Sequence, residues 1–127
     1  MNPPIAEPAL RGLTVLDASR VLAGPYCSML LADLGATVIK VERPPSGDDT
    51  RSWGPPYLGD PDQGLSAYFL SVNRGKQSVC VDLQNPSGRE LMLDMVHHAD
   101  VLIENFAPGV AARLGLGPEA IEVANPK

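Results

Sequence analysis

Five basic side chains are the first candidates for binding chemistry, because each lies next to a predicted strand or in the loop that follows one. They are Arg20, Arg43, Arg74, Lys76 and Arg113. Guanidinium groups bind phosphate oxygens in a bidentate manner, and backbone amides at the start of a helix strengthen such a site. Each cation could instead be a solvated surface charge. We expect all five at the carboxyl-end rim of the predicted sheet, where as a set they predict a site for a ligand that carries several phosphates.

Catalytic groups are harder to find. Ser19, Cys27 and Ser28 are possible nucleophiles, but no histidine is spaced to lie near them. His97 and His98 follow a predicted helix at its C-terminus, where an imidazolium interacts favourably with the helix dipole. The residues therefore predict a binding domain without a nucleophile–base pair.

Acidic residues gather between residues 45 and 66 without the spacing of a metal site, so we expect a solvated loop and no metal. They are Asp48, Asp49, Asp60 and Asp62. Cys27 and Cys80 lie in apolar segments and do not form a disulfide framework or a zinc pattern. We expect both to be buried free thiols.

A strand–helix–strand unit over residues 13–44 must position the first of the cations. Residues 13–16 (LTVL) are apolar and β-branched, which is typical of a strand buried on both faces, and residues 38–41 (VIKV) form a second strand. Between them, Gly24 can cap a helix, Pro25 suits its first position and Gly35 is the expected left-handed stop. The apolar stripe of this helix is supplied by Met29, Leu30, Leu31 and Leu34.

Parallel strands joined by a helix bind ligands beyond their carboxyl ends, so residues 19–24 and 42–43 should share one rim of the sheet. A dinucleotide site would need G-x-G-x-x-G at the first strand–helix turn, but residues 23–28 read AGPYCS, with a single glycine. We therefore do not expect NAD at this rim.

The rest of the chain continues the alternation of strands and helices. Residues 45–66 are rich in Gly and Pro, and Trp53 with Tyr57 could form either an aromatic wall over a pocket or simple loop packing. Further elements are predicted at 67–72 (a short strand or helical turn), 77–83 (strand), 86–98 (helix, burying Leu91, Met92, Met95 and Val96), 101–103 (strand), 110–114 (helix) and 116–124 (helix). This pattern predicts an α/β fold with a Rossmann-like parallel sheet and flanking helices.

Composition excludes several classes of partner. The 127 residues carry 15 acidic and 10 basic side chains, a net charge of −5, which argues against nucleic acid or an anionic membrane. No apolar run approaches the ~18 residues of a membrane span. The Pro-rich N-terminus has no basic region followed by an apolar core, so we expect no signal peptide and a cytoplasmic location.

Several stretches together resemble the family III CoA-transferases, which include formyl-CoA transferase and α-methylacyl-CoA racemase. They read LRGLTVLDASRVLAGPYCSMLLADLGATVIKVERP, GDDTRSWGPP, YFLSVNRGKQSVCVDL and ADVLIENFAPGVAARLGLG. The second stretch is most similar to members that use succinyl-CoA and a dicarboxylic acid acceptor, such as the glutarate CoA-transferases.

The resemblance implies that residues 10–127 form an incomplete N-terminal CoA-binding domain. The sequence itself predicts a flexible tail over residues 1–9. The resemblance further implies an interlocked homodimer and a CoA-transferase that works through an aspartyl-CoA thioester, with CoA as a substrate rather than a permanently bound cofactor. The acceptor would be a carboxylic acid. The nucleophilic aspartate is expected beyond residue 127, because in the family it lies some tens of residues after the motif that reads ENFAPG here. Asp17, Asp33 and Asp100 match structural positions of the family.

The resemblance also implies which residues contact CoA, and it implies no metal ligand. These residues are Leu22, Ala23, Arg43, Val81, Asp82, Leu83, Gln84, Asn105, Phe106, Ala107 and Arg113. Two alternatives remain open from sequence. One is an acyl-CoA racemase or epimerase, which would exchange the α-proton by acid–base chemistry. The other is a non-catalytic CoA-binding fragment.

Overall fold

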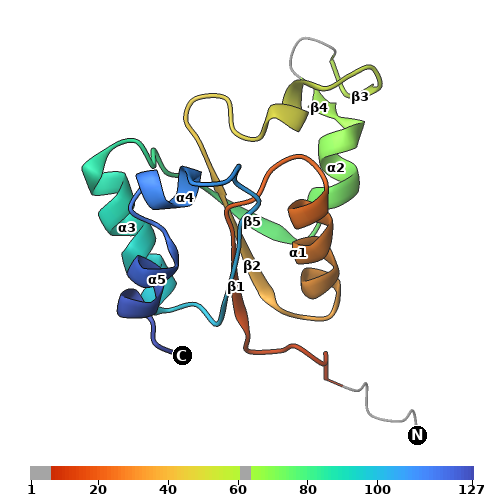
Figure 1. The fold of residues 1–127 in the computed structure, drawn as a ribbon. Coiled ribbons are helices and arrows are strands. Elements are labelled where there is room, and N and C mark those ends of the chain that lie inside the picture. Colours follow the sequence, from red (N-terminus) through yellow and green to blue (C-terminus); the bar gives the residue numbers. More distant parts are fainter. Residues whose placement is uncertain (1–6, 61–63) are drawn as a thin grey trace, which may run out of the picture.

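The computed structural model describes residues 7–60 and 64–127. Its centre is a four-stranded parallel sheet in the order β5-β2-β1-β6 (Figure 1). These strands are β1 (Thr14–Asp17), β2 (Thr37–Glu42), β5 (Lys76–Cys80) and β6 (Val101–Ile103). The predicted α/β fold with a parallel sheet is therefore confirmed, although β5 ends three residues earlier than the strand expected over 77–83.

Helices cover both faces of this sheet. Figure 1 shows α1 (Ala23–Asp33) and α2 (Ala67–Asn73) on one face. The other face carries α3 (Pro86–His97), α4 (Val110–Arg113) and α5 (Pro118–Ala124). No helix within the two described ranges is both long enough and apolar enough to cross a membrane.

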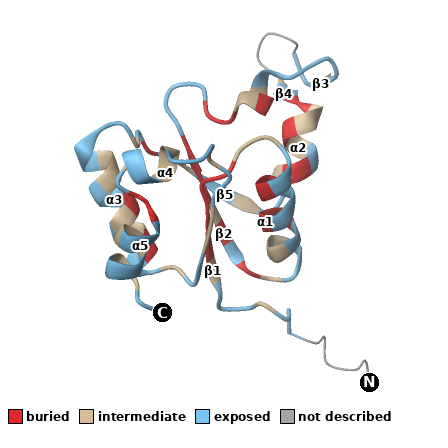
Figure 2. Cartoon of the chain, in the orientation of Figure 1, coloured by how far each residue is buried: buried red, intermediate tan, exposed pale blue. Residues whose placement is uncertain are grey.

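Alternate residues of β1 supply the cores of the two layers. Val15 packs with Ala36 and Val38 on the side of α1, whereas Leu16 packs with Met92 of α3 on the other side. Because successive side chains of a strand point to opposite faces, a strand covered on both sides needs apolar residues at consecutive positions, as at Val15 and Leu16. Figure 2 shows this burial, with buried residues concentrated in the central strands and in the helix faces that meet them.

Helix α1 differs in two respects from its prediction. It begins at Ala23 with Leu22 as its cap, before the predicted start at Gly24 and Pro25. Met29 is buried as expected, but Leu30 and Leu34 remain 42% and 51% exposed, because the face toward the sheet runs through residues 24, 25, 28 and 29. The predicted stop is confirmed, since Gly35 has φ +101°.

Helix α3 follows its prediction more closely. The Asn85 side chain accepts a hydrogen bond from the Ser87 backbone N–H at 3.0 Å, and Pro86 is the first helical residue. Met92 and Val96 are buried as expected. Leu91 is exposed, contrary to the prediction, and Leu93 packs against the core in its place.

The segment predicted to be irregular contains short regular elements. These are a 3₁₀ turn, η1 (Asp49–Ser52), and a small antiparallel pair, β3 (Tyr57–Leu58) with β4 (Leu65–Ser66). The Trp53 ring packs edge-on against Tyr68 of α2, at 5.4 Å between ring centroids, as the packing alternative expects. Asp62 and residues 1–6 of the predicted tail lie outside the described residues.

Candidate functional site

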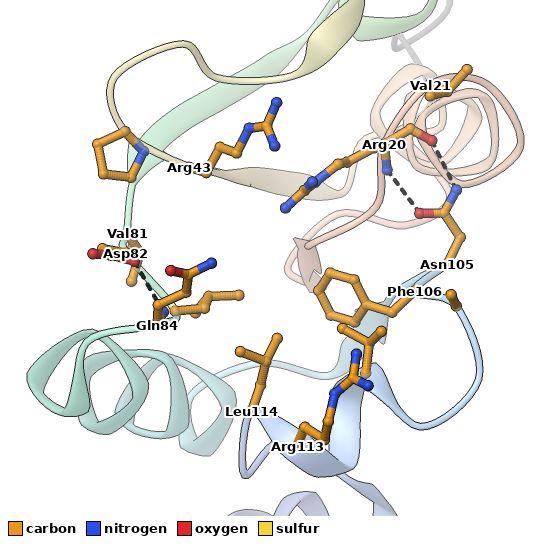
Figure 3. A pocket seen from close by; sticks show the side chains of 14 residues that line it. Arg20, Val21, Arg43, Val81, Asp82, Gln84, Asn105, Phe106, Arg113 and Leu114 are labelled. Atoms are coloured by element: carbon orange, nitrogen blue, oxygen red, sulfur yellow. Dashed lines mark hydrogen bonds between the residues drawn. The ribbon is translucent and has the colours of Figure 1, made fainter.

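A cavity of about 700 Å³ opens beyond the carboxyl ends of the four parallel strands (Figure 3). Its walls come from the loops that follow β1, β2, β5 and β6, and from α4. Of the residues predicted to share a rim, Arg20, Val21 and Arg43 line this cavity. Its volume is within the range of roughly 300–1,000 Å³ that is typical of small-molecule sites.

Most of the residues predicted to contact CoA line this cavity. Those that do are Arg43, Val81, Asp82, Leu83, Gln84, Asn105, Phe106, Ala107 and Arg113. Leu22 and Ala23 are not among the lining residues, because the chain turns away at Val21 to begin α1. The fold thus brings together segments from residue 43 to residue 113 that no local sequence pattern connects.

The prediction of contact residues missed several lining residues. They are Arg20, Val21, Pro44, Val110 and Leu114. Arg20 was already a candidate cation of the first loop, and its position directly after a buried strand was the signal that could have included it. Val110 and Leu114 are four residues apart around α4, a spacing that places two apolar side chains on one helical face.

Two predicted rim cations lie elsewhere. Arg74 precedes β5 and Lys76 is its first residue, so the backbone of both is at the amino end of that strand, and the prediction that they lie on the carboxyl-end rim is wrong. The Arg74 guanidinium binds Asp33 at the end of α1, with an Nε–Oδ1 distance of 3.1 Å. The Lys76 side chain is buried, and its Nζ is 2.9 Å from Asp17 Oδ2.

The remaining arginines make the cavity a basic site in an acidic chain. In Figure 3, Arg20 and Arg43 extend toward one another from opposite walls, and Arg113 extends from α4. Arg43 forms an ion pair with the exposed Asp49. Within residues 7–60 and 64–127, no carboxylate pairs with the guanidinium of Arg20 or of Arg113. Two uncompensated cations therefore face the cavity.

Apolar side chains fill the opposite part of the lining. The Phe106 ring points into the cavity, where Val81, Leu83 and Leu114 also contribute (Figure 3). The Phe106 backbone N–H donates to Glu104 Oε2 at 2.7 Å, which fixes the turn that presents the ring. A flat apolar or aromatic group of a ligand could lie here while its anionic part reaches the arginines.

Beneath the rim, a buried ion cluster joins the first two loops. Lys40 is 2% exposed, and its Nζ lies 2.9 Å from Asp48 Oδ2, 4.0 Å from Asp17 Oδ2 and 3.1 Å from the Ser19 carbonyl oxygen. Asp48 is only 3% exposed, so the prediction that it is a solvated loop residue is wrong. The acid folds inward because it pairs with a lysine at the centre of β2.

The carboxylates of this cluster are held in their charged form. Burial alone would raise the pKa of Asp17, but hydrogen bonds from Lys76, Ser19 and Ser28, with the charge of Lys40, lower it overall. Burial likewise opposes ionisation of Asp48, yet hydrogen bonds from Thr50 and Lys40 lower its pKa. The predicted structural role of Asp17 is consistent with this enclosure.

Glu42, the last residue of β2, fixes the start of the loop that follows this strand. It accepts hydrogen bonds from Arg51 at 2.6 and 2.7 Å, from Ser78 Oγ at 2.6 Å and from the Asp48 N–H at 2.8 Å. Burial would raise its pKa, but these donors lower it to about 2. The loop that carries Arg43 is therefore folded back against β2 and β5.

The other predicted chemical groups lie outside the cavity. The Asp100 carboxylate accepts a hydrogen bond from the Thr14 backbone N–H at 2.8 Å, and the Asp33 carboxylate accepts one from Arg74. Both aspartates therefore have structural roles. Cys27 and Cys80 are free, as expected, but both are exposed, so the prediction of burial is wrong. Among the described residues, no group of three or more His, Cys, Asp or Glu side chains is arranged to hold a metal ion.

Comparisons with known proteins show the family to which this chain is related. The model of "CoA-transferase family III" matches residues 10–127. The succinate–glutarate CoA-transferase of Agrobacterium fabrum is 49% identical over 98% of this chain, and the human succinyl-CoA:glutarate CoA-transferase is 49% identical over 92%. This chain spans only 32% and 26% of the lengths of these two relatives.

Solved structures agree with this match. A CAIB/BAIF family protein from Brucella suis superposes with a TM-score of 0.86 and 47% identity, over 92% of this chain and 31% of that one. A Mycobacterium tuberculosis protein superposes with a TM-score of 0.81 and 42% identity, over 94% of this chain and 31% of that one. The parallel sheet and its rim are thus shared with the N-terminal part of these larger proteins, and the chain belongs to CoA-transferase family III.

Proposed function

We propose that the rim cavity binds the CoA part of an acyl-CoA and that the chain is the N-terminal CoA-binding part of a CoA-transferase. The supporting observation is that three arginines, two of them without a carboxylate partner among the described residues, face one cavity beyond the parallel strands. Among the described residues that line it, Asp82 is the one acidic side chain. A polyanionic ligand suits this balance of charge.

The two parts of the lining suit the two ends of a nucleotide. CoA carries an adenine ring, a 3′-phosphate and a diphosphate. The adenine would pack against Phe106 and Leu83, while Arg20, Arg43 and Arg113 would bind the phosphates. This division agrees with the contacts that the sequence resemblance implies for Leu83, Arg43, Phe106 and Arg113.

The acyl groups are proposed from the relatives. The Agrobacterium and human proteins are named as transferases between succinate and glutarate, and an Acetobacter aceti relative as an acetyl-CoA:oxalate CoA-transferase, 49% identical over 91% of this chain. We infer that this chain serves an enzyme acting on dicarboxylic acids, with succinyl-CoA as one donor. The GDDTRSWGPP stretch, residues 47–56, supports this assignment.

The chemistry proposed for the whole enzyme is covalent catalysis by a carboxylate. An aspartate attacks the acyl-CoA thioester, which forms a mixed anhydride and releases CoA thiolate. The thiolate then attacks the aspartyl carbonyl, which forms an aspartyl-CoA thioester and releases the donor acid. The acceptor carboxylate reverses these two steps. Asp17 is unsuited to this role because it is fully buried and accepts a hydrogen bond from Lys76. We propose that the nucleophile lies outside these residues. We also propose that the whole enzyme is an interlocked homodimer.

Calorimetric titration with CoA tests the proposal. Arg43→Ala should weaken binding by about 1–3 kcal/mol, the loss expected for a charged hydrogen bond. Arg74→Ala is the matched control, because Arg74 pairs with Asp33 away from the cavity. Equal affinity of the wild type and the Arg43 variant would remove Arg43 from the site.

A further inference from the structure

Val21 has a backbone conformation that a β-branched residue rarely adopts. Its φ is +69°, and it is the sole non-glycine residue with positive φ in the described ranges. Such left-handed residues persist only where the surrounding structure fixes them, and they gather at functional sites. Val21 lies in the loop between β1 and α1, directly after Arg20, and both residues line the cavity.

Asn105 holds the residue that precedes this turn. Its Oδ1 accepts a hydrogen bond from the Arg20 backbone N–H at 2.9 Å, and its Nδ2 donates to the Arg20 carbonyl oxygen at 2.8 Å (Figure 3). The partners define the orientation of the amide, since the N–H of Arg20 can only donate and its carbonyl can only accept. One side chain from the loop after β6 thus fixes both polar groups of one residue after β1.

The preceding residues of the loop are fixed too. The Ala18 N–H donates to the Ile103 carbonyl at 2.8 Å, and Lys40 Nζ donates to the Ser19 carbonyl at 3.1 Å. After Arg20, no such bond to Val21 is formed by the described residues, and the chain reverses there into α1. The Asn105 amide is therefore the last attachment before the left-handed turn.

We propose that Asn105 is a positioning residue that sets the direction of the Arg20 guanidinium, and that it contributes to ligand affinity through Arg20 and not through its own contact with the ligand. This inference rests on the proposed function of the cavity. In Figure 3 the Asn105 amide points to the Arg20 backbone, whereas the Arg20 side chain extends into the cavity toward Arg43. The structure thus gives the two lining residues different roles.

A double-mutant cycle separates these roles, with CoA as the probe and calorimetry as the readout. Arg20→Met and Asn105→Ala should each weaken CoA binding about tenfold, as expected for loss of one charged interaction. In the double variant, Asn105→Ala should add less than about twofold to the loss caused by Arg20→Met, because the side chain that it positions is already absent. Independent ligand contacts would instead give about a hundredfold loss.

Asn125→Ala is the matched control. The Asn125 amide also fixes backbone groups, since its Nδ2 donates to the carbonyls of Val96 at 2.9 Å and Ala99 at 2.8 Å, but it lies outside the cavity lining. It should lower the melting temperature without changing CoA affinity. Hydrogen exchange of the Arg20 amide is the second readout, and it should accelerate in the Asn105 variant and not in the Asn125 variant.

The outcomes distinguish this inference from the proposed function. Additive losses in the double variant, or an Asn105→Ala variant that binds CoA as tightly as the wild type, would overturn the positioning role while the cavity remained the CoA site. Wild-type protein that does not bind CoA would overturn both. Coupled losses together with faster exchange at Arg20 would support both.

Discussion

Lys40 is the residue whose removal should most destabilise the buried ion cluster beneath the cavity. Its ammonium is buried between Asp48 and Asp17 and also donates to the Ser19 carbonyl. Lys40→Met keeps an apolar chain of similar length and removes the charge. The variant leaves the Asp48 carboxylate buried with only the Thr50 backbone and side chain as donors, at 3.0 and 2.8 Å.

The expected loss follows from this enclosure. Removing one partner of a buried ion pair costs about 3–5 kcal/mol in the free energy of unfolding, because the other charge remains out of water without compensation. Asp17 keeps Lys76 at 2.9 Å, so the unpaired charge is mainly that of Asp48. We expect Lys40→Met to destabilise the fold by about 3 kcal/mol, the lower end of this range.

Urea denaturation followed by circular dichroism measures this loss. Arg11→Met is the control, because Arg11 pairs with Glu7 at the surface, where an ion pair contributes less than about 1 kcal/mol. Adding Asp48→Asn to Lys40→Met should recover part of the stability, since the buried charge is then removed. A Lys40→Met variant as stable as the Arg11 control would show that the Lys40 ammonium does not stabilise the fold.

Two further predictions concern Glu42 at the end of β2 and Gly24 in the first turn of α1. The pKa of Glu42 is lowered to about 2 from an ordinary value of 4.5, so its contribution to stability is complete above about pH 4.5 and is lost as the pH falls toward 2. Acid titration of unfolding should therefore show a smaller decline for Glu42→Gln than for the wild type over this range, and parallel curves would contradict the assignment. Gly24→Ala should destabilise the fold by about 1–3 kcal/mol in urea, because a Cβ there would overlap the Ser19 side chain. Unchanged stability would mean that this contact relaxes freely.

The layered fold could be predicted because its signals are local. The β-branched runs around Val15 and Val38, the Asn85 cap and the Gly35 stop each act within a few residues of their own position. Burial on individual helix faces was less predictable. Leu30 and Leu91 are apolar residues in helices, yet both are exposed, because the face that meets the sheet depends on the angle at which each helix packs.

The cavity was predictable only in part for a related reason. Residues at the carboxyl ends of parallel strands share a rim by topology, which is why Arg20 and Arg43 were expected in one site. Asp48 appeared to be a solvated acid because its partner Lys40 lies in a strand that reads as apolar. The turn at Val21 carries no glycine, so the sequence contained no signal that the chain would leave the rim before Leu22.

CoA binding at the rim is best tested by calorimetric titration of this chain with CoA and, separately, with dephospho-CoA. Binding of CoA that weakens when the 3′-phosphate is removed is the predicted result, because the rim arginines would lose one anionic partner. Equal affinity for the two compounds, or no binding of either, would contradict the claim that this rim is a CoA site.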